Sequence, residues 1–221
     1  MRYRNIVVLT GAGISQAAGL PTYRGPGGLW SNPDLAALAD VSALRARRDE
    51  ACAMFWQFRQ QIAGVAPTAA HRALAKYDLT IITQNVDGLH QKAGSQRVIE
   101  YHGSLARWRC ERCGIEEAPA GEKQPYHCFE AMRPAAVLFG ELIPPEAEHL
   151  TKRALRDCDL FVAIGTSGTV WPAAGFVRSA QYAGAHTVLM NLEVDAESRE
   201  HFAEVREGRA DDVVPAFLES L

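Results

Sequence analysis

Polar side chains follow two short apolar runs in the middle of the chain. The runs are residues 79–83 and 98–101, and the side chains that follow them are Gln84, Asn85, Asp87 and His102. If both runs are strands, these side chains lie at the carboxyl edge of the sheet, where open α/β sheets bind their ligands. Imidazole exchanges a proton near neutral pH, so a histidine at this edge favours a catalytic base. The alternatives are an ordinary Asn and Asp turn and a structural histidine.

Two glycines end an apolar run near the N-terminus. The run is residues 6–9, and Thr10-Gly11-Ala12-Gly13 follows it. Glycines let a buried strand turn sharply into a helix whose first N–H groups can hold a phosphate. However, Gln16 stands where the dinucleotide fingerprint has its third glycine, and no acidic residue ends a second strand about 20 residues further on. The pattern therefore weighs against a hydride-transfer dehydrogenase, and a glycine turn without a ligand is the alternative.

A loop rich in glycine and proline comes next, at residues 19–28. It carries Tyr23 and Arg24. A flexible loop with an aromatic residue and an arginine, placed directly after a strand and a helix, is typical of a lid over a bound ligand.

Three of the five cysteines are spaced for a metal ion. Cys110-x-x-Cys113 is followed by Cys128, and three thiolates leave one position of a tetrahedral zinc site to fill. The nearby candidates for the fourth ligand are His127, Glu122 and Glu130. Histidine is the best donor type, but His127 is adjacent to Cys128. We expect a structural zinc ion, and a distorted site or no site are the alternatives.

Composition narrows the class of protein. The 221 residues are 48% hydrophobic with a net charge of −3, which predicts one domain or one domain with a small appendage. There is no Lys/Arg run of the kind that binds nucleic acid. The four-residue apolar run near the N-terminus is too short for a secretory signal, and no run is long enough to span a bilayer. We expect a soluble cytoplasmic protein, in which the isolated Cys52 and Cys158 are buried thiols. A monomer is compatible with the sequence, which leaves the oligomeric state open.

Strands and helices alternate along most of the chain. A helical insertion is predicted from Asn32 to about Gly64, in which Trp56 and Arg59 share one face. By spacing alone, these two residues fit a packed aromatic beside a solvated arginine. Residues 104–139 interrupt the alternation. Later strands are expected to end at Gly165-Thr166-Ser167 and at Asn191-Leu192-Glu193, and a last helix follows Ala210.

These residues together resemble the sirtuin family. The motifs are GAGIS at 11–15, GLPTYRG at 19–25, TQNVDGLH at 83–90, His102-Gly103, the three cysteines, FGE at 139–141, GTS at 165–167 and Asn191-Leu192-Glu193. Their order and spacing are similar to those of bacterial NAD-dependent protein-lysine deacylases. The resemblance implies an α/β fold, with a Rossmann-type parallel-sheet domain from residues 1–30, 78–103 and 140–221. A small domain, built of the helical insertion and a zinc ribbon, would comprise residues 31–77 and 104–139.

The resemblance also implies roles for the site residues. Asn85 would order the nicotinamide ribose, Asp87 would bind the carboxamide and His102 would accept a proton from a ribose hydroxyl. The residues expected to bind NAD, the co-substrate, are Gly11, Ala12, Gly13, Ser15, Tyr23, Arg24, Gln84, Asn85, Asp87, Gly165, Thr166, Ser167, Asn191, Glu193 and Ala210. The other substrate would be an acyl-lysine protein or peptide, and the products would be free lysine, nicotinamide and O-acyl-ADP-ribose.

Several positions depart from the family pattern. Thr22-Tyr23-Arg24 replaces Asp-Phe-Arg in the lid, and Pro125 stands where the family has its third cysteine. Trp56 and Arg59 align with the Tyr-x-x-Arg pair that recognises acidic acyl groups in some sirtuins. Ala136 precedes Val137 and would enlarge the acyl pocket.

The residues expected to contact the acyl-lysine substrate are Trp56, Arg59, Val137 and Phe139. The acyl group itself stays open. Protein mono-ADP-ribosylation and a non-catalytic NAD-binding module are the alternative functions.

Overall fold

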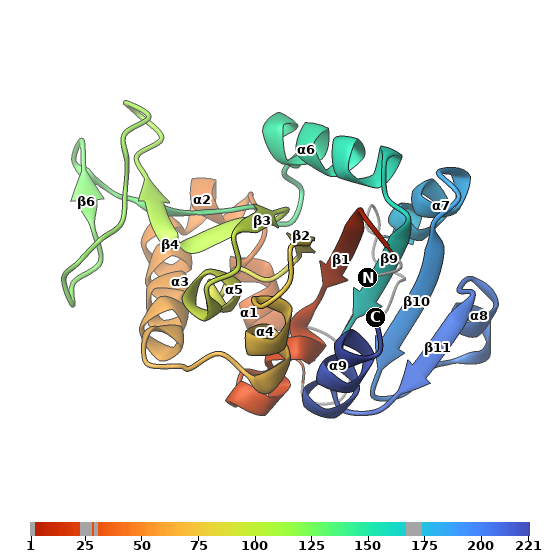
Figure 1. The fold of residues 1–221 in the computed structure, drawn as a ribbon. Coiled ribbons are helices and arrows are strands. Elements are labelled where there is room, and N and C mark those ends of the chain that lie inside the picture. The colour runs from red at the N-terminus through yellow and green to blue at the C-terminus, as the bar shows by residue number, and fades with distance from the viewer. Residues whose placement is uncertain (1–2, 23–27, 29–30, 167–173) are drawn as a thin grey trace.

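A six-stranded parallel sheet forms the larger part of the molecule (Figure 1). The computed structural model describes residues 3–22, 28, 31–166 and 174–221. The sheet order is β11-β10-β9-β1-β2-β3, and every pairing is parallel. The bounds are β1 Ile6–Thr10, β2 Thr80–Thr83, β3 Arg97–Glu100, β9 Leu160–Ile164, β10 His186–Asn191 and β11 Glu204–Glu207. The predicted Rossmann-type sheet is therefore confirmed.

Helices cover both faces of the sheet. Ile6 and Val8 belong to a core with helices α4 and α9, whereas Val7 and Leu9 belong to a core with α6 and α7. The helices are α4 Ala69–Leu74, α5 Leu89–Ala93, α6 Pro145–Arg156, α7 Ala174–Tyr182, α8 Ala196–Glu200 and α9 Ala210–Glu219. Successive side chains of a strand point to opposite faces, so a strand covered on both sides is a continuous apolar run. This is why the central strands could be recognised in the sequence.

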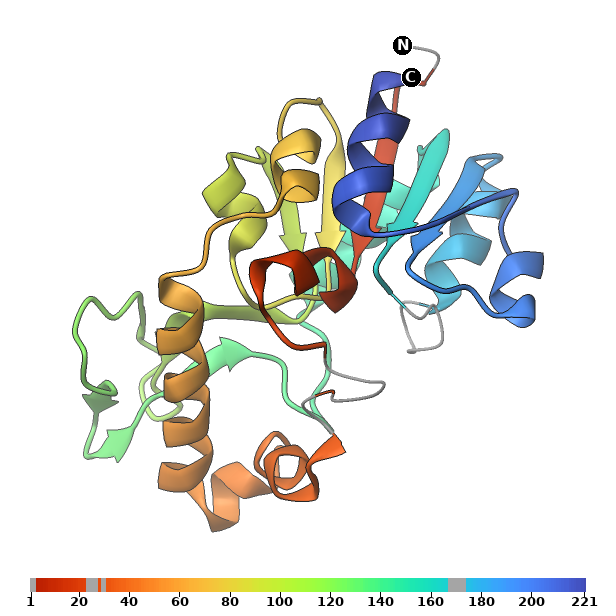
Figure 2. The same cartoon turned by 90° about the horizontal axis from the view of Figure 1, so that it is seen from below.

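A smaller lobe lies beside the β3 edge of the sheet (Figures 1 and 2). It contains the helices α1 Pro33–Leu38, α2 Ala43–Ala46 and α3 Arg48–Ala63, the strands β4 Gly103–Arg109, β5 Glu116–Glu117 and β8 Arg133–Ala136, and the hairpin β6 Tyr126–His127 with β7 Glu130–Ala131. Its apolar core is separate from the two cores of the sheet and includes Phe55, Trp56, Leu105, Trp108 and Met132. The lobe thus has its own hydrophobic interior.

Local signals explain where the lobe's first helix begins. The Asn32 side chain accepts a hydrogen bond from the Asp34 N–H at 3.0 Å, and Pro33 occupies the first turn of α1. Both features are favoured at helix N-termini.

Helix α4, which falls within residues 31–77, packs with α9 against the sheet. The division of the chain at residue 77 stays a prediction, and the packing of α4 places that helix on the sheet side.

Among the described residues, no helix combines the length and the apolar character that a membrane crossing requires.

Candidate active site

Glycines allow the ends of β1 and β9 to meet backbone to backbone. The Gly11 N–H donates to the Ile164 carbonyl at 3.0 Å, and the Gly13 N–H donates to the Gly165 carbonyl at 2.9 Å. A Cβ on Gly13 would lie 2.6 Å from the Gly165 Cα, and Gly165 itself has a φ of +61°. The chain then forms a 3₁₀ helix, η1, over Ala12–Ala18. Both glycine N–H groups are already bonded to backbone carbonyls. These glycines therefore let the two backbone segments approach each other closely, and their N–H groups are not available to a ligand.

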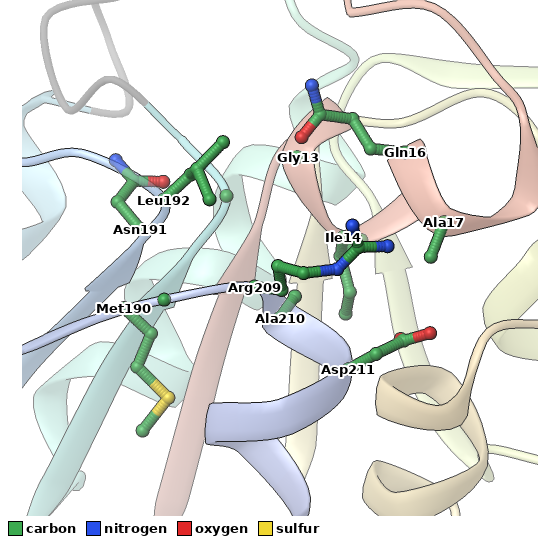
Figure 3. A pocket seen from close by; sticks show the side chains of 12 residues that line it. Gly13, Ile14, Gln16, Ala17, Met190, Asn191, Leu192, Arg209, Ala210 and Asp211 are labelled. Atoms are coloured by element: carbon green, nitrogen blue, oxygen red, sulfur yellow. The ribbon is translucent and has the colours of Figure 1, made fainter.

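A cavity of about 390 Å³ opens between η1, the end of β10 and the start of α9 (Figure 3). Four residues predicted to bind the cofactor line it: Gly13, Gly165, Asn191 and Ala210. The sequence interpretation missed Ile14, Gln16, Ala17, Met190, Leu192, Gly208, Arg209 and Asp211. Each of these residues lies within two positions of a predicted cofactor-binding residue or belongs to η1. Closeness in sequence to a predicted residue could therefore have identified them. Glu193 and Ala12 do not line this cavity, and Glu193 is exposed.

Asn85 joins the glycine turn to Asp87. Its Nδ2 donates to the Gly11 carbonyl at 3.0 Å and approaches the Ser15 Oγ at 3.3 Å, and that hydroxyl donates to Asp87 Oδ2 at 2.8 Å. Asn85 is only 3% exposed, and its Oδ1 has no hydrogen-bond partner among the described residues. A buried acceptor without a partner is costly unless a ligand supplies a donor. The arrangement fits a hydroxyl-bearing ligand such as a ribose.

Thr166 connects three strand ends. Gln84, after β2, donates from Nε2 to the Thr166 Oγ1 at 2.9 Å, and Asn191, at the end of β10, donates from Nδ2 to the Thr166 carbonyl at 2.8 Å. The carboxyl ends of β2, β9 and β10 therefore form one polar rim, as the predicted parallel order requires.

His102 is held in one tautomer by a backbone carbonyl. Its Nδ1 lies 3.1 Å from the carbonyl oxygen of Gln84, which can only accept, so Nδ1 carries the proton. Nε2 is then the unprotonated nitrogen. Burial lowers the pKa of His102 below its ordinary value, although the hydrogen bond to Gln84 works in the opposite direction. The neutral imidazole is thus a base at the rim that carries Asn85.

Two further histidines lie fully buried behind this rim, and the sequence interpretation gave them no role. His90 Nε2 is 2.9 Å from the Thr10 Oγ1, and the His71 and His90 ring centroids are 4.6 Å apart. Burial lowers the pKa of His71 to about 4 and that of His90 to about 3. Both are therefore neutral at pH 7, and they tie α4 and α5 to β1.

Four side chains gather at the tip of the small lobe. The ligand atoms of Cys110, Cys113, His127 and Cys128 all lie within 4.8 Å of one another. His127 Nδ1 is 3.3 Å from the Cys113 Sγ and 3.2 Å from the Cys128 Sγ. A tetrahedral zinc ion places its ligand atoms roughly 3.5 Å apart, so three thiolates and one imidazole fit a structural zinc site.

The adjacency of His127 and Cys128 is accommodated by the backbone. Cys128 and Phe129 have φ values of +49° and +66°, so the chain turns sharply directly after His127. Neither Glu122 nor Glu130 belongs to the group. The Glu130 carboxylate instead pairs with Arg48 at 3.4 Å and with Arg112 at 3.6 Å.

Trp56 and Arg59 face the segment that follows β5. The Trp56 indole N–H donates to the Glu122 carbonyl at 3.0 Å, and the Arg59 guanidinium lies 4.7 Å from the Trp56 ring and hydrogen-bonds the Pro119 carbonyl. Arg59 and residues 119–123 line a second cavity, which shares no lining residue with the first. The structure therefore does not bring this pair into the cavity that contains Asn191.

The remaining predicted substrate residues follow β8. The Val137 N–H donates to the His102 carbonyl at 2.9 Å, and Phe139 is 42% exposed. The predicted contacts Tyr23, Arg24 and Ser167 lie outside the described residues.

The fold and the site together define a class of protein. The strand ends of the parallel sheet carry a glycine turn, a neutral base and an acceptor that has no partner among the residues the structure describes, and the neighbouring lobe holds a metal-ligand group. These features are typical of a Rossmann-type nucleotide-binding protein with an inserted metal ribbon. The model of the Sir2 family matches residues 11–172. This chain belongs to the Sir2 family.

Known relatives and solved structures are similar to this chain over nearly its whole length. An NAD-dependent protein deacylase of Vibrio parahaemolyticus is 41% identical, covering 99% of this chain and 95% of its own. One of Pasteurella multocida is 42% identical, covering 96% of each. A Sir2 homologue bound to NAD superposes with a TM-score of 0.88 at 30% identity, covering 99% of this chain and 90% of its own.

Proposed function

We propose that this protein removes acyl groups from the lysines of proteins in a reaction that consumes NAD. One observation carries the proposal: the unprotonated Nε2 of His102 belongs to the same strand-end rim as the Asn85 Oδ1, which has no hydrogen-bond partner in the described part of the chain. A ribose needs a hydrogen-bond acceptor to orient it and a base to take one of its protons. The names of the relatives, NAD-dependent protein deacylases, support the same activity.

NAD would supply the nicotinamide–ribose bond: as this bond breaks and nicotinamide leaves, the acyl oxygen of the acyl-lysine would bond to the sugar. Water would then release the free lysine and leave O-acyl-ADP-ribose. Asn85 would orient the ribose through Oδ1, because its Nδ2 is already fixed by Gly11. Asp87, held by Ser15 and by the Leu89 N–H at 2.9 Å, would bind the carboxamide. His102 would take a ribose hydroxyl proton on Nε2. The cavity beside Asn191 and Ala210 would hold the adenosine half.

The remaining contacts are proposed from the family pattern. Gly11, Gly13 and Gly165 would let the pyrophosphate approach the backbone, and Tyr23 and Arg24 would cover the nicotinamide ribose. The other proposed NAD contacts are Ala12, Ser15, Gln84, Thr166, Ser167 and Glu193. The three cysteines and His127 would hold a structural zinc ion that stabilises the ribbon.

An acyl-lysine peptide would bind along Val137 and Phe139, next to His102. The structural neighbours include a Sir2 protein bound to a p53 peptide and NAD⁺, at a TM-score of 0.82, 27% identity and coverage of 99% of this chain and 94% of that one. Trp56 and Arg59 are proposed to contribute to the acyl-binding end. Because NAD and reduced cysteine ligands are both intracellular, we place the activity in the cytoplasm.

The decisive experiment measures nicotinamide release from NAD with and without an acetyl-lysine peptide. We expect release to depend on the peptide and to fall by at least about 100-fold in His102→Ala, the usual contribution of a general base. His149→Ala is the matched control, because His149 is exposed on α6. Normal turnover by His102→Ala would refute the proposed base. Consumption of NAD without deacylation would instead support mono-ADP-ribosylation, and NAD binding without consumption would support a non-catalytic module.

The same assay with acetyl-, succinyl- and longer acyl-lysine peptides identifies the preferred acyl group. A preference for succinyl that disappears in Arg59→Gln would assign Arg59 to a carboxylate on the substrate. An unchanged preference would remove Arg59 from the acyl site.

A further inference from the structure

A fully buried arginine joins the metal ribbon to the turn beside His102. The side chain of Arg133, the first residue of β8, is 0% exposed. Its Nη1 and Nη2 form two hydrogen bonds with the Glu141 carboxylate at 2.5 and 2.7 Å, Nη1 also reaches Glu111 at 3.3 Å, and the backbone carbonyls of Pro134 and Ala136 take the remaining bonds. All five guanidinium donors are thereby used, so the geometry of Arg133 is fixed.

Glu141 holds a tight turn. Its Oε2 accepts the Leu138 N–H at 2.8 Å, and its own N–H donates to the Leu138 carbonyl at 3.1 Å. Within this turn the Phe139 N–H donates to Ala39 at 2.9 Å. Directly before the turn, Val137 is bound to the His102 carbonyl at 2.9 Å. The carboxylate of Glu141 thus fixes the segment that connects the base to the proposed peptide-binding residues.

Glu111 connects the same arginine to the metal-ligand group. It lies between the ligands Cys110 and Cys113, and its carboxylate pairs with Arg48 of α3 at 2.8 Å as well as with Arg133. Arg48 in turn donates from Nε to the Ala131 carbonyl at 3.0 Å. The Glu111 carboxylate therefore links the Cys110–Cys113 knuckle to Arg133.

We propose that Arg133 and Glu141 are positioning residues that hold the Leu138–Glu141 turn for the acyl-peptide, and that Glu111 couples metal binding in the ribbon to peptide binding at this turn. The inference rests on the proposed function, because it assigns the turn to the peptide. Arg133 and Glu141 do not touch the reacting atoms. They act through the backbone of Ala136 and Leu138, on either side of Val137.

The first test measures binding of a fluorescein-labelled acetyl-lysine peptide by anisotropy, alongside NAD affinity and zinc content. In Glu141→Gln we expect the peptide Kd to rise about tenfold, the size of a typical coupling between sites, with NAD affinity unchanged. Since a single change leaves a buried charge, the paired variant Arg133→Met/Glu141→Leu removes both charges and favours a stable fold. It should show the same loss of peptide affinity.

Glu204→Gln is the matched control, because it removes a half-buried carboxylate that also pairs with an arginine, Arg206 at 2.6 Å, on β11 at the far edge of the sheet. If the paired variant binds NAD and peptide as the parent protein does, the positioning role is wrong. If the parent protein itself binds no acyl-peptide, the proposed function has failed instead.

The second test asks whether the metal acts through Glu111. Chelation of zinc should weaken peptide binding by the parent protein by about tenfold, and should have a smaller effect in Glu111→Gln, in which the connection is already weakened. Equal losses in both proteins would show that the metal and the turn are independent. NAD affinity of the metal-free protein reports whether the sheet domain stays folded. If chelation also abolishes NAD binding, the metal holds the whole molecule together and the specific coupling through Glu111 is wrong.

Discussion

At the scale of single residues, the lowered pKa of His102 sets a pH dependence. Burial lowers the pKa of His102, so the imidazole stays neutral, and able to accept a proton, below its ordinary value of 6.5. Activity should therefore be lost only as the pH falls through a value below 6.5. The acid limb of kcat/KM for NAD, measured with saturating acyl-peptide, should have its midpoint under that value. A midpoint above 6.5 would mean that another group limits the rate.

His127 is the residue that decides the metal site. Because its Nδ1 lies 3.2 and 3.3 Å from two thiolates, we expect about one zinc ion per chain. His127→Ala should lose the metal, whereas His127→Cys should retain it, since thiolate is an equivalent zinc ligand. Metal analysis of the purified variants tests this. Full zinc occupancy in His127→Ala would assign the fourth position to water or to another residue.

At the scale of elements, Gly165 sets the distance between β9 and η1. A Cβ at this position would lie 2.5 Å from the Ile14 nitrogen, in a residue whose φ is +61°. Gly165→Ala should therefore push η1 away from the rim and weaken NAD binding by at least about tenfold, because a misplacement of 1 Å is enough to reduce binding and catalysis.

Gly184→Ala is the matched control for Gly165→Ala. Gly184 has a similar φ of +83°, but its added Cβ would meet nothing within 4 Å. This control should cost about 1 kcal/mol of stability from backbone strain and leave NAD affinity unchanged. Equal NAD affinities in the two variants, measured by calorimetry, would show that close approach at Gly165 is unnecessary.

The paired histidines of α4 and α5 make stability depend on pH. His71 and His90 have pKa values lowered by burial to about 4 and about 3, whereas in the unfolded chain both titrate near 6.5. Below pH 6.5 the unfolded chain therefore binds more protons, and stability falls as the pH falls. Each histidine should cost about 1 kcal/mol between pH 7 and pH 5.5.

Urea unfolding at these two pH values measures this loss. His90→Gln, which can still donate to Thr10, should reduce the pH dependence, whereas the exposed His149→Gln should not. An unchanged slope in His90→Gln would show that folding does not lower the pKa of His90.

At the scale of the whole molecule, the sheet could be predicted more fully than the site. Strands β1 and β9 are buried on both faces and are therefore apolar runs. The edge strand β11, Glu204–Glu207, has one apolar residue, Val205, among three charged ones and is mostly half-buried, so it does not stand out from a loop. Arg209 lines the cavity because α9 begins beside η1, and its spacing in the sequence does not show this.

Contacts between polar side chains of different elements could not be predicted from the sequence either. The pairing of His71 with His90 and that of Arg133 with Glu141 depend on how separate elements pack. Patterns of residue type predict which face of an element is buried, but they do not identify the side chain that will meet it there.

The separate cores predict that the two lobes unfold separately. Trp108 is 0% exposed, packs edge to face on Trp56 at 5.2 Å, and belongs to the core of the small lobe, which shares no buried residue with the two cores of the sheet. Trp108→Ala should cost about 3–5 kcal/mol by leaving a large cavity. Amide hydrogen exchange should then lose protection in α3, β4 and β8, and keep it in β1, β9 and β10.

Phe161→Ala, in the sheet core, is the reciprocal variant and should release protection in the sheet first. The two lobes nevertheless touch, because the Leu105 N–H of β4 donates to the carbonyl of Val86, which follows β2 of the sheet, at 3.0 Å. If this contact makes the lobes one cooperative unit, either variant will release protection everywhere, and the predicted division into two domains is wrong. Selective loss would mean that the peptide-binding side can loosen while the nucleotide-binding sheet stays folded.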